Sequence, residues 1–401
     1  MNIIFLTLSH VLSVSERGIY ADLMRKFRDN GHNVYMVTSS ERRFGIETSL
    51  KDTDGVQLLN VKTLNIQKTN VVEKGIGTLL IESQYKQAIK KHLKDVKFDL
   101  ILYTTPPITL TSVVKYLKKK NPQAVTYLLM KDIFPQNAVD LGMFGTDSLF
   151  YKYFRRTEKE LYAVSDYVGC MSPANVDYLK RHNPEIDPDT VEVAPNSLEL
   201  VDMKPLDKNV LREKYGLPTD RPILIYGGNL GKPQGIDYLL RCLDANKGRT
   251  DCHFLIIGNG TEYGKIEAWY EANKGGNVTV MQRLPKEDYD DLVRSCDVGL
   301  IFLDHRFTIP NYPSRLLSYL ENKMPVIAAT DVNTDIGSIA EENGYGLCCE
   351  SREVADFTAC VNDMIAHPDK MREMGERGFE FLKENYVTDV TYGRIMAHVV
   401  K

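Results

Sequence analysis

Residues 297–328 place a helical segment between two short apolar stretches, and this alternation limits the fold more than any other feature of the chain. The stretches at 298–302 (VGLIF) and 326–329 (VIAA) carry no charged residue, and the segment between them contains Pro313-Ser314-Arg315. Strands this short and apolar, joined by a helix, are typical of a parallel sheet covered on both faces. The sequence therefore predicts a βαβ unit here.

The start of the helix predicted after Pro313 indicates the kind of ligand. In parallel sheets, ligands bind at the carboxyl ends of the strands. A helix that begins there offers free N–H groups and its positive dipole end to a phosphate. Arg315 adds a guanidinium that can bind a phosphate through two hydrogen bonds. We expect a phosphorylated small molecule at this position.

The same alternation runs through the chain twice. Apolar strands are predicted at 3–7, 32–38, 56–61, 100–104, 125–130, 167–171 and 191–194, and then at 223–226, 253–257, 278–281, 298–302, 326–329 and 346–348. Between the two series, the stretch 196–222 is rich in proline, glycine and charge, which is typical of a linker with a short helix. The pattern predicts an α/β fold with two doubly wound, Rossmann-like domains that face each other across a cleft.

We place these domains at 1–198 and 199–380. The remaining stretch, 381–401, contains a final helix predicted from about residue 392, with no strand after it. We expect this helix to pack back on the N-terminal domain.

Composition excludes several classes of protein. The chain has 401 residues, of which 43% are hydrophobic and 26% charged, as in ordinary globular proteins. It has no apolar run long enough for a membrane span, and MNIIFLTLSH is better explained as a first core strand than as a signal peptide. The seven cysteines form no C-x-x-C pair, so neither a zinc site nor a disulfide framework is indicated. We therefore expect a cytoplasmic protein.

Charge is shared unevenly between the halves. Residues 1–200 hold 26 Lys and Arg against 23 Asp and Glu, whereas residues 201–401 hold 24 against 31. Many lysines of the first half fall in two predicted helices, 84–97 and 113–120. These helices have a solvated basic face or contact an anionic lipid surface, and the sequence leaves both interpretations open. Nucleic acid is not expected, because the chain is acidic overall and has no basic motif interleaved with aromatic residues.

A glycine-rich loop opens the second series. In ILIYGGNLGKPQG, Gly228 and Gly231 follow a strand, and Asn229, Lys232 and Gln234 supply polar side chains. Glycines allow a tight strand-to-helix turn, and they also let backbone N–H groups approach a phosphate, so both explanations stay open. The loop lacks the ending of a Walker motif, and LIIGNGTEYG misses the spacing of the dinucleotide fingerprint, which argues against a nicotinamide enzyme.

The second half of the chain resembles a known family in four segments. They occur in the order GGNLGKPQG, FLIIGNG, QRLPKEDYDDLVRSCDVGLIFL and NYPSRLLSYLENKMPVIA. This half is similar to the donor half of bacterial family 4 retaining glycosyltransferases, which use nucleotide sugars and have the GT-B fold. In the first half, SERGIYADLMRKFRDNGHNVYMVTS resembles the opening loop and helix of that family. YLLMKDIFPQNAVDLGM resembles a segment of its polysaccharide-biosynthesis members.

The resemblance implies a role for each matching residue. The loop Gly228 to Gly231 and Lys232 are expected at the donor diphosphate together with Ser314 and Arg315. The residues implied at the ribose or base are Asn259 and Leu284. The residues implied on the acceptor side are Glu16, Arg17, Gly18 and Lys131. Asp132, at the end of a strand, is expected beside the sugar, and the residues implied in catalysis are Asp132, Arg315 and Lys232.

Two departures from the family pattern affect the donor site. The family's paired glutamates are replaced by Pro310 and Ser318. Glu321, one helical turn after Ser318, is our candidate for ribose binding, and a surface glutamate is the equally simple alternative. The family's Arg and Lys on the diphosphate loop are here Asn229 and Gln234. The positive charge that neutralises the diphosphate is therefore expected from Arg315 and Lys232.

The resemblance implies transfer of a sugar, with retention, from a nucleotide-diphosphate sugar, most simply a UDP-sugar, to a glycan or polyprenyl-linked acceptor. The enzyme would be a hexosyl- or N-acetylhexosaminyl-type transferase without metal or other cofactor. It would be cytoplasmic, at the inner face of the membrane if the basic helices bind lipid. A non-hydrolysing nucleotide-sugar epimerase and a non-catalytic glycosyltransferase-like subunit remain as alternatives.

Overall fold

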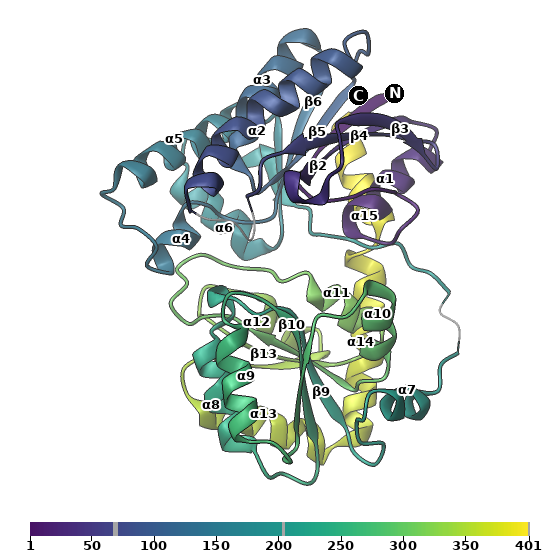
Figure 1. The fold of residues 1–401 in the computed structure, drawn as a ribbon, viewed down its shortest axis with the longest axis vertical. Coiled ribbons are helices and arrows are strands. Elements are labelled where there is room, and N and C mark those ends of the chain that lie inside the picture. Colours follow the sequence, from purple (N-terminus) through teal and green to yellow (C-terminus); the bar gives the residue numbers. More distant parts are fainter. Residues whose placement is uncertain (67–70, 203–204, 400–401) are drawn as a thin grey trace. The chain divides into compact units, whose positions relative to one another are not determined.

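The computed structural model describes residues 1–66, 71–202 and 205–399, and its internal contacts divide the chain into two compact units. Unit 1 comprises Met1–Glu199 and Tyr386–Lys401, and unit 2 comprises Leu200–Asn385. Figure 1 shows that each unit is a sheet covered by helices. Residues 203–204 of the expected linker lie outside the described residues.

The sheet of unit 1 has, in the described part, eight strands in the order β3-β4-β2-β1-β5-β6-β7-β8. The strands are β1 Asn2–Leu6, β2 Asn33–Glu41, β3 Ser49–Thr53, β4 Val56–Thr63, β5 Leu100–Thr105, β6 Val125–Met130, β7 Tyr167–Cys170 and β8 Val191–Val193. β3 pairs antiparallel with β4, while the described pairs from β4 through to β8 are parallel. Parallel pairing requires helical crossovers, and these cover the sheet.

The helices of unit 1 are α1 Ile19–Asp29, α2 Val71–His92, α3 Thr111–Lys120, α4 Gln136–Asp140, α5 Leu149–Ala163, α6 Pro173–His182 and α15 Thr388–Met396, with short 3-10 turns η1 Arg42–Phe44, η2 Ile108–Leu110 and η3 Pro188–Thr190. α2 ends at His92, before the end of the helix expected at 84–97. The edge strand β3 was not predicted. It joins β4 through Asp54-Gly55, both with positive φ, as in a two-residue hairpin turn.

The C-terminal helix α15 returns to unit 1, as predicted. It begins at Thr388, four residues before the expected start. Tyr392 packs edge-on against Phe27 of α1, with ring centroids 5.0 Å apart, and its hydroxyl lies 3.0 Å from His32 Nε2. These contacts hold the end of the chain against the N-terminal sheet.

The sheet of unit 2 has, in the described part, six parallel strands in the order β11-β10-β9-β12-β13-β14. They are β9 Ile223–Asn229, β10 His253–Asn259, β11 Val278–Gln282, β12 Val298–Phe302, β13 Val326–Thr330 and β14 Gly346–Glu350. The helices are α7 Lys208–Lys214, α8 Ile236–Asn246, α9 Tyr263–Ala272, α10 Lys286–Arg294, α11 Arg315–Glu321, α12 Ile336–Glu342, α13 Val354–Ala366 and α14 Pro368–Asn385, with the 3-10 turn η4 Lys232–Gln234. This order is that of a Rossmann fold, and the switch point lies between β9 and β12.

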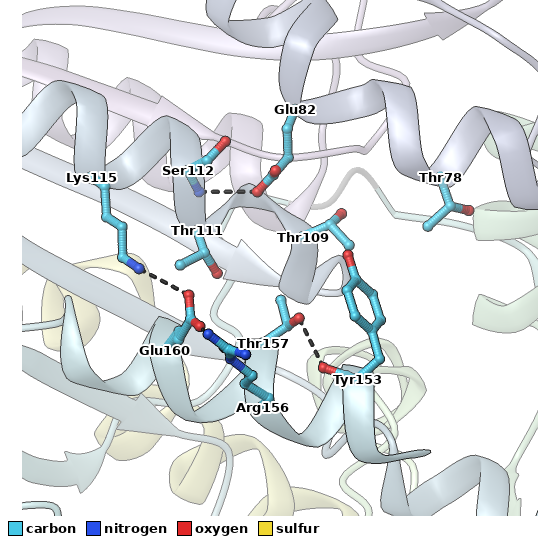
Figure 2. Close-up of a pocket in the computed structure, with 10 residues that line it drawn as sticks. All are labelled: Thr78, Glu82, Thr109, Thr111, Ser112, Lys115, Tyr153, Arg156, Thr157 and Glu160. Atoms are coloured by element: carbon cyan, nitrogen blue, oxygen red, sulfur yellow. Dashed lines mark hydrogen bonds and ion pairs between the residues drawn. The ribbon is translucent and has the colours of Figure 1, made fainter. Parts of the chain in front are cut away.

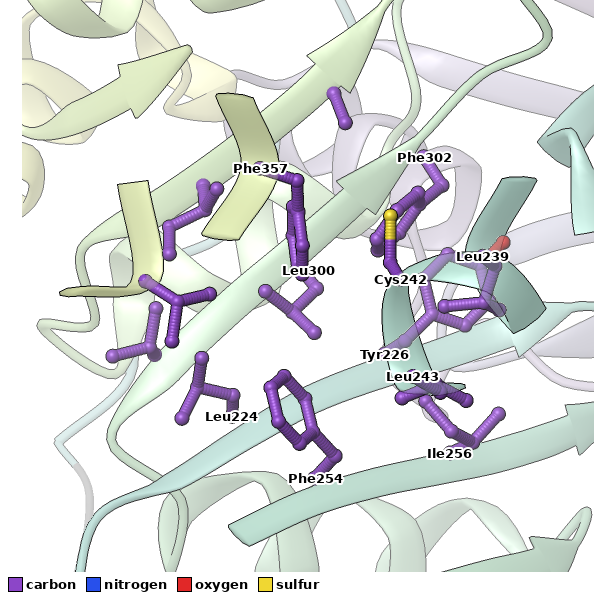
Figure 3. Close-up of a cluster of buried hydrophobic side chains, with 14 of the residues drawn as sticks. Leu224, Tyr226, Leu239, Cys242, Leu243, Phe254, Ile256, Leu300, Phe302 and Phe357 are labelled. Carbon is purple, nitrogen blue, oxygen red and sulfur yellow. The ribbon is translucent and has the colours of Figure 1, made fainter. Parts of the chain in front are cut away.

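The core of unit 2 lies between this sheet and helices that include α8 and α13 (Figure 3). Tyr226 of β9 and Phe302 of β12 meet edge-on with ring centroids 5.9 Å apart, and Phe302 also contacts Phe357 of α13 at 5.1 Å. All three side chains are almost completely buried. Burial of large aromatic side chains is a major source of stability, so this cluster fixes the strands that carry the loops described next.

Among the described helices, none combines the length and the apolarity that a membrane crossing needs.

The seven cysteines are free, and four of them, Cys170, Cys242, Cys252 and Cys296, are buried. Burial raises the pKa of the Cys170, Cys242 and Cys296 thiols to about 12, so these groups stay protonated packing residues at neutral pH.

Candidate functional site

A pocket of about 380 Å³ opens at the carboxyl ends of β9, β10 and β11 in unit 2. Its described lining residues are Gly228, Asn229, Ile257, Gly258, Asn259, Arg283, Leu284, Lys286 and Tyr289. The sequence predicted four of these, Gly228, Asn229, Asn259 and Leu284. The lining includes two cations and, among the described residues, no carboxylate, so the pocket favours an anionic ligand.

The floor of this pocket exists because two glycines lie side by side. Gly258 pairs with Gly228 across β10 and β9. A Cβ at Gly258 would lie 1.8 Å from the carbonyl oxygen of Gly228, and φ of Gly258 is +157°. Only glycine satisfies both the space and the backbone angle. The two glycines therefore let the two strand ends close up beneath the pocket.

Arg315 lies next to this floor. Its Nη2 is 3.6 Å from the position that a Cβ at Gly228 would occupy, and its guanidinium lies over the ring of Tyr226, 4.2 Å from the centroid. Arg315 Nη1 is buried and has no hydrogen-bond partner among the described residues. A buried cationic donor without a partner is costly, which favours an anionic ligand at this point.

The loop after β9 is held by its own side chains. Gln234 Oε1 accepts hydrogen bonds from Asn229 Nδ2 and from the backbone N–H of Gly231, both at 3.1 Å. Tyr226 donates to the carbonyl of Asn229 at 3.0 Å. Lys232 is exposed on the η4 turn. Asn229 and Gln234 thus fix the shape of the loop, and Lys232 supplies its charge.

Arg283, Lys286 and Tyr289 were missed by reasoning from the sequence. Arg283 follows β11, and Lys286 opens α10, where it pairs with Asp290 at 2.5 Å. The hydroxyl of Tyr289 lies 2.0 Å from the position of a Cβ at Gly227, so this ring covers the β9 backbone. The signal was present, because QRLPKEDY places two basic residues directly after a predicted strand.

The remaining predicted donor residues lie on α11, which has seven residues. Ser314 is exposed at its N-cap position. Ser318 and Glu321 do not belong to the described lining of the pocket. Glu321 is the last residue of the helix and is 9% exposed, so it is neither a solvated surface residue nor part of the pocket wall.

In unit 1, Asp132 and Lys131 follow β6 and are half-buried. Asn137 donates to Asp132 Oδ2 at 2.9 Å. Burial raises the pKa of Asp132 to about 6, although the hydrogen bonds from Ile133 and Asn137 oppose this shift. Lys131 donates from Nζ to the carbonyl of Ala194 at 2.9 Å, and burial lowers its pKa to about 7. Lys131 is thus directed toward the backbone of its own unit.

The expected acceptor-side loop leads into α1. Gly18 donates its N–H to Asp22 Oδ1 at 2.8 Å, and Arg17 donates from Nη2 to the carbonyl of Glu199 at 3.0 Å. Glu16 is exposed, and its carbonyl accepts from Arg25 at 3.2 Å. The structure therefore uses Arg17 and Gly18 to anchor the loop and leaves the Glu16 side chain accessible.

No group of three or more His, Cys, Asp or Glu side chains within the described ranges is arranged to hold a metal ion. The described titratable groups at this pocket are cations and a tyrosine. The chemistry that this arrangement supports is charge stabilisation of an anionic group at the carboxyl edge of the unit 2 sheet.

Comparison with known proteins extends this picture. Residues 207–381 match the family described as glycosyl transferases group 1. The probable glycosyltransferase WbjE of Pseudomonas aeruginosa is 22% identical over 280 residues, which make up 68% of this chain and 67% of WbjE.

Two solved structures are similar over almost their full lengths. Sucrose-phosphate synthase of Thermosynechococcus elongatus has a TM-score of 0.76 and 17% identity, covering 99% of this chain and 98% of its own. HepE of Anabaena, solved in complex with UDP, has a TM-score of 0.68 and 13% identity, covering 100% and 99%. At such identities the similarity shows the fold alone. The chain therefore has the GT-B fold, and its residues 207–381 match the group 1 glycosyl transferases.

Proposed function

We propose that the protein transfers a hexosyl or N-acetylhexosaminyl group from a UDP-sugar to a glycan or polyprenyl-linked acceptor in polysaccharide synthesis. The observation that carries the donor assignment is the buried, unpartnered Nη1 of Arg315 beside Gly228, at the edge of a pocket without described carboxylates. The choice of UDP is supported by the UDP complex of the structurally similar HepE.

In this proposal, the pocket of unit 2 has an apolar part and a charged part, and each binds a different part of the donor. Ile257, Leu284 and the ring of Tyr289 provide contact area for the base and ribose. Arg315 and the backbone near Gly228 bind the diphosphate. Lys232 approaches the same group from the η4 turn.

Sugar transfer breaks the bond between the anomeric carbon and the diphosphate oxygen, and negative charge then grows on the leaving group. Fixed N–H donors and guanidinium groups stabilise that charge, which is commonly the largest contribution to catalysis. This chemistry needs no metal ion or other cofactor. Retention of the anomeric configuration is proposed from the family resemblance.

On the acceptor side, Asp132 is the proposed polar neighbour of the transferred sugar. Its pKa of about 6 leaves the carboxylate mostly ionised at neutral pH, able to accept hydrogen bonds from sugar hydroxyls. The accessible side chain of Glu16 is the second group proposed to contact the acceptor.

The test of the proposed function is an assay of UDP release from a panel of UDP-sugars, with and without oligosaccharide or polyprenyl-linked acceptors, followed by NMR of the product anomer. Release that depends on an acceptor supports the transferase. Conversion of the UDP-sugar into an epimeric UDP-sugar without acceptor, and without net release of UDP, would indicate the epimerase alternative. Absence of any thermal stabilisation by UDP would indicate a non-catalytic subunit, since a bound ligand stabilises the folded state.

We also propose that unit 1 contacts anionic lipid through a basic face formed by α2 and α3. Lys90 of α2 and Lys120 of α3 both lie over the ring of Tyr116, at 5.2 and 5.4 Å, so their charges are adjacent. Lys91 and Lys119 are exposed on the same two helices. Each basic residue near an anionic membrane contributes about 1 kcal/mol.

Co-sedimentation with phosphatidylserine vesicles at low salt tests this contact. We expect binding that weakens when Lys91 and Lys119 are both replaced by Glu. If the protein stays entirely in the supernatant, the basic face of α2 and α3 is a solvated helix surface and not a lipid contact.

A further inference from the structure

A second pocket, of about 260 Å³, lies within unit 1 among side chains of α2, the η2 turn, α3 and α5 (Figure 2). Five of its described lining residues carry a Ser or Thr hydroxyl, and Tyr153 adds a phenol. Hydroxyl groups both donate and accept hydrogen bonds. The pocket is thus equipped for a ligand that carries many donors and acceptors of its own.

The charges in this pocket neutralise one another. Lys115 Nζ lies 2.9 Å from Glu160 Oε2, and Arg156 Nε lies 3.0 Å from Glu160 Oε1. Glu82 accepts a hydrogen bond from the N–H of Ser112 at 3.0 Å, near the start of α3. The lining contains two cations and two carboxylates among the described residues. A neutral ligand therefore fits this pocket better than an anion such as a nucleotide.

Thr109 provides the observation that points directly to a ligand. It lines the pocket and is only 5% exposed, yet its Oγ1 has no hydrogen-bond partner among the described residues. Other hydroxyls here are engaged, such as Thr111, which donates to the carbonyl of Ile108 at 3.0 Å. A buried hydroxyl without a partner is destabilising, so a ligand that bonds to it gains affinity.

Tyr153 forms an aromatic wall for the same pocket. Its side chain is 50% exposed, and Figure 2 shows its ring close to Thr109. An exposed ring offers an apolar surface with a polar edge, which suits a sugar ring with its C–H face and its hydroxyl rim. The volume lies just below the usual range for ligand pockets, about 300–1,000 Å³, so a single ring fits better than a chain.

We propose that this pocket binds one neutral saccharide ring, separately from the donor pocket of unit 2. The ring stacks on Tyr153, a sugar hydroxyl bonds to Thr109, and the paired charges of Lys115 and Glu160 bond to others. That the ring belongs to the glycan acceptor rests on the proposed function, whereas the binding itself does not.

The experiment is saturation-transfer NMR on the full chain with the methyl glycosides of glucose, galactose, N-acetylglucosamine and N-acetylgalactosamine at millimolar concentration. We expect transfer to at least one glycoside. In the Thr109→Val variant we expect its affinity to fall about threefold to tenfold, the range for one neutral hydrogen bond. Tyr153→Ala should also weaken binding.

The matched control is Thr391→Val. Thr391 is also a threonine of unit 1, is 1% exposed and has a buried Oγ1 without a described partner, but it lies on α15, away from the pocket. This variant should bind the glycoside like the unmodified protein. Thr109→Val removes no described hydrogen bond, so it is expected to fold normally.

Two results would overturn the proposal: no transfer to any glycoside, or the same affinity in Thr109→Val and Thr391→Val. UDP binding, measured by calorimetry on the same samples, separates this test from that of the proposed function. If the unmodified protein binds UDP but no glycoside, only the saccharide pocket is rejected. If the unmodified protein does not bind UDP, the proposed donor is rejected.

Discussion

Arg315 stacks on Tyr226, with the guanidinium carbon 4.2 Å from the ring centroid. Tyr226 is fully buried in the core of unit 2, so the ring on which the guanidinium lies is held in place. The stacked side chain is thereby oriented before any ligand arrives, and pre-organisation lowers the entropic cost of binding. This relationship makes Arg315 the first residue to test.

Arg315→Ala should weaken UDP binding about tenfold to a hundredfold, because it removes charge-assisted hydrogen bonds, each about 1.5–3 kcal/mol. Titration calorimetry measures this change. Arg241→Ala is the matched control, since Arg241 also lies over a tyrosine ring of unit 2, Tyr238 at 5.4 Å, but outside the pocket lining. Equal affinities in the two variants would refute the diphosphate role.

Gly258→Ala should destabilise unit 2 by about 2 kcal/mol or more, since the new Cβ meets the carbonyl of Gly228 at 1.8 Å. Gly264→Ala is the comparison, because no heavy atom lies within 4 Å of a Cβ there and Gly264 is within α9. Alanine in a helix is favoured by up to about 1 kcal/mol. Urea unfolding monitored by circular dichroism should therefore shift the two variants in opposite directions.

The pKa of Asp132, raised to about 6 by burial, predicts a pH dependence of stability. The unfolded carboxyl has a pKa near 3.9, so the folded state holds the proton more tightly. The resulting stability is fully present below about pH 4 and is lost as the pH rises through about 6. Asp132→Asn avoids the buried charge and can still accept the bond from Asn137. We expect it to be more stable than the unmodified protein at pH 8 by up to about 3 kcal/mol, and equally stable at pH 3.5.

The same titration should appear in catalysis. If the ionised Asp132 contacts the sugar, kcat/KM falls as the pH drops through about 6, and Asp132→Asn loses this limb of the profile along with most of the activity. Initial rates across pH 5 to 8 measure it. A profile that is the same in the variant would exclude Asp132 from the transfer step.

Glu321→Gln should change UDP affinity less than about twofold, because Glu321 ends α11 and is not part of the described pocket lining. Calorimetry with UDP and with the base-free ligand pyrophosphate checks this. A loss of affinity for UDP but not for pyrophosphate would instead support the ribose role that we predicted for Glu321 in place of the missing glutamate.

The strands were predictable because their pattern is local. The stretches 298–302 and 326–329 match β12, Val298–Phe302, and β13, Val326–Thr330, closely. Both strands are covered on two faces, so every position except Thr330 is apolar and the run itself marks the element. The edge strand β3 was not recognised, because SLKDT at the rim of the sheet alternates too weakly to stand out.

The glycine loop and Arg315 were recognisable for a similar reason. Each is a short motif at a strand end, and the doubly wound pattern assigns strand ends to one edge of a sheet. The strand pattern placed the loops with Gly228 and Asn259 at one edge, the family resemblance added Leu284, and these residues line one pocket in the structure.

The sequence by itself determined the two doubly wound sheets, the sheet edge at which the pocket of unit 2 opens and the return of the last helix to unit 1. Only the tertiary structure decided which side chains meet. The order β11-β10-β9-β12 brings Tyr289 against Gly227 and Arg315 against Gly228. In unit 1, packing left the hydroxyl of Thr109 buried without a described partner. Such contacts depend on packing between elements far apart in sequence, which local periodicity does not encode.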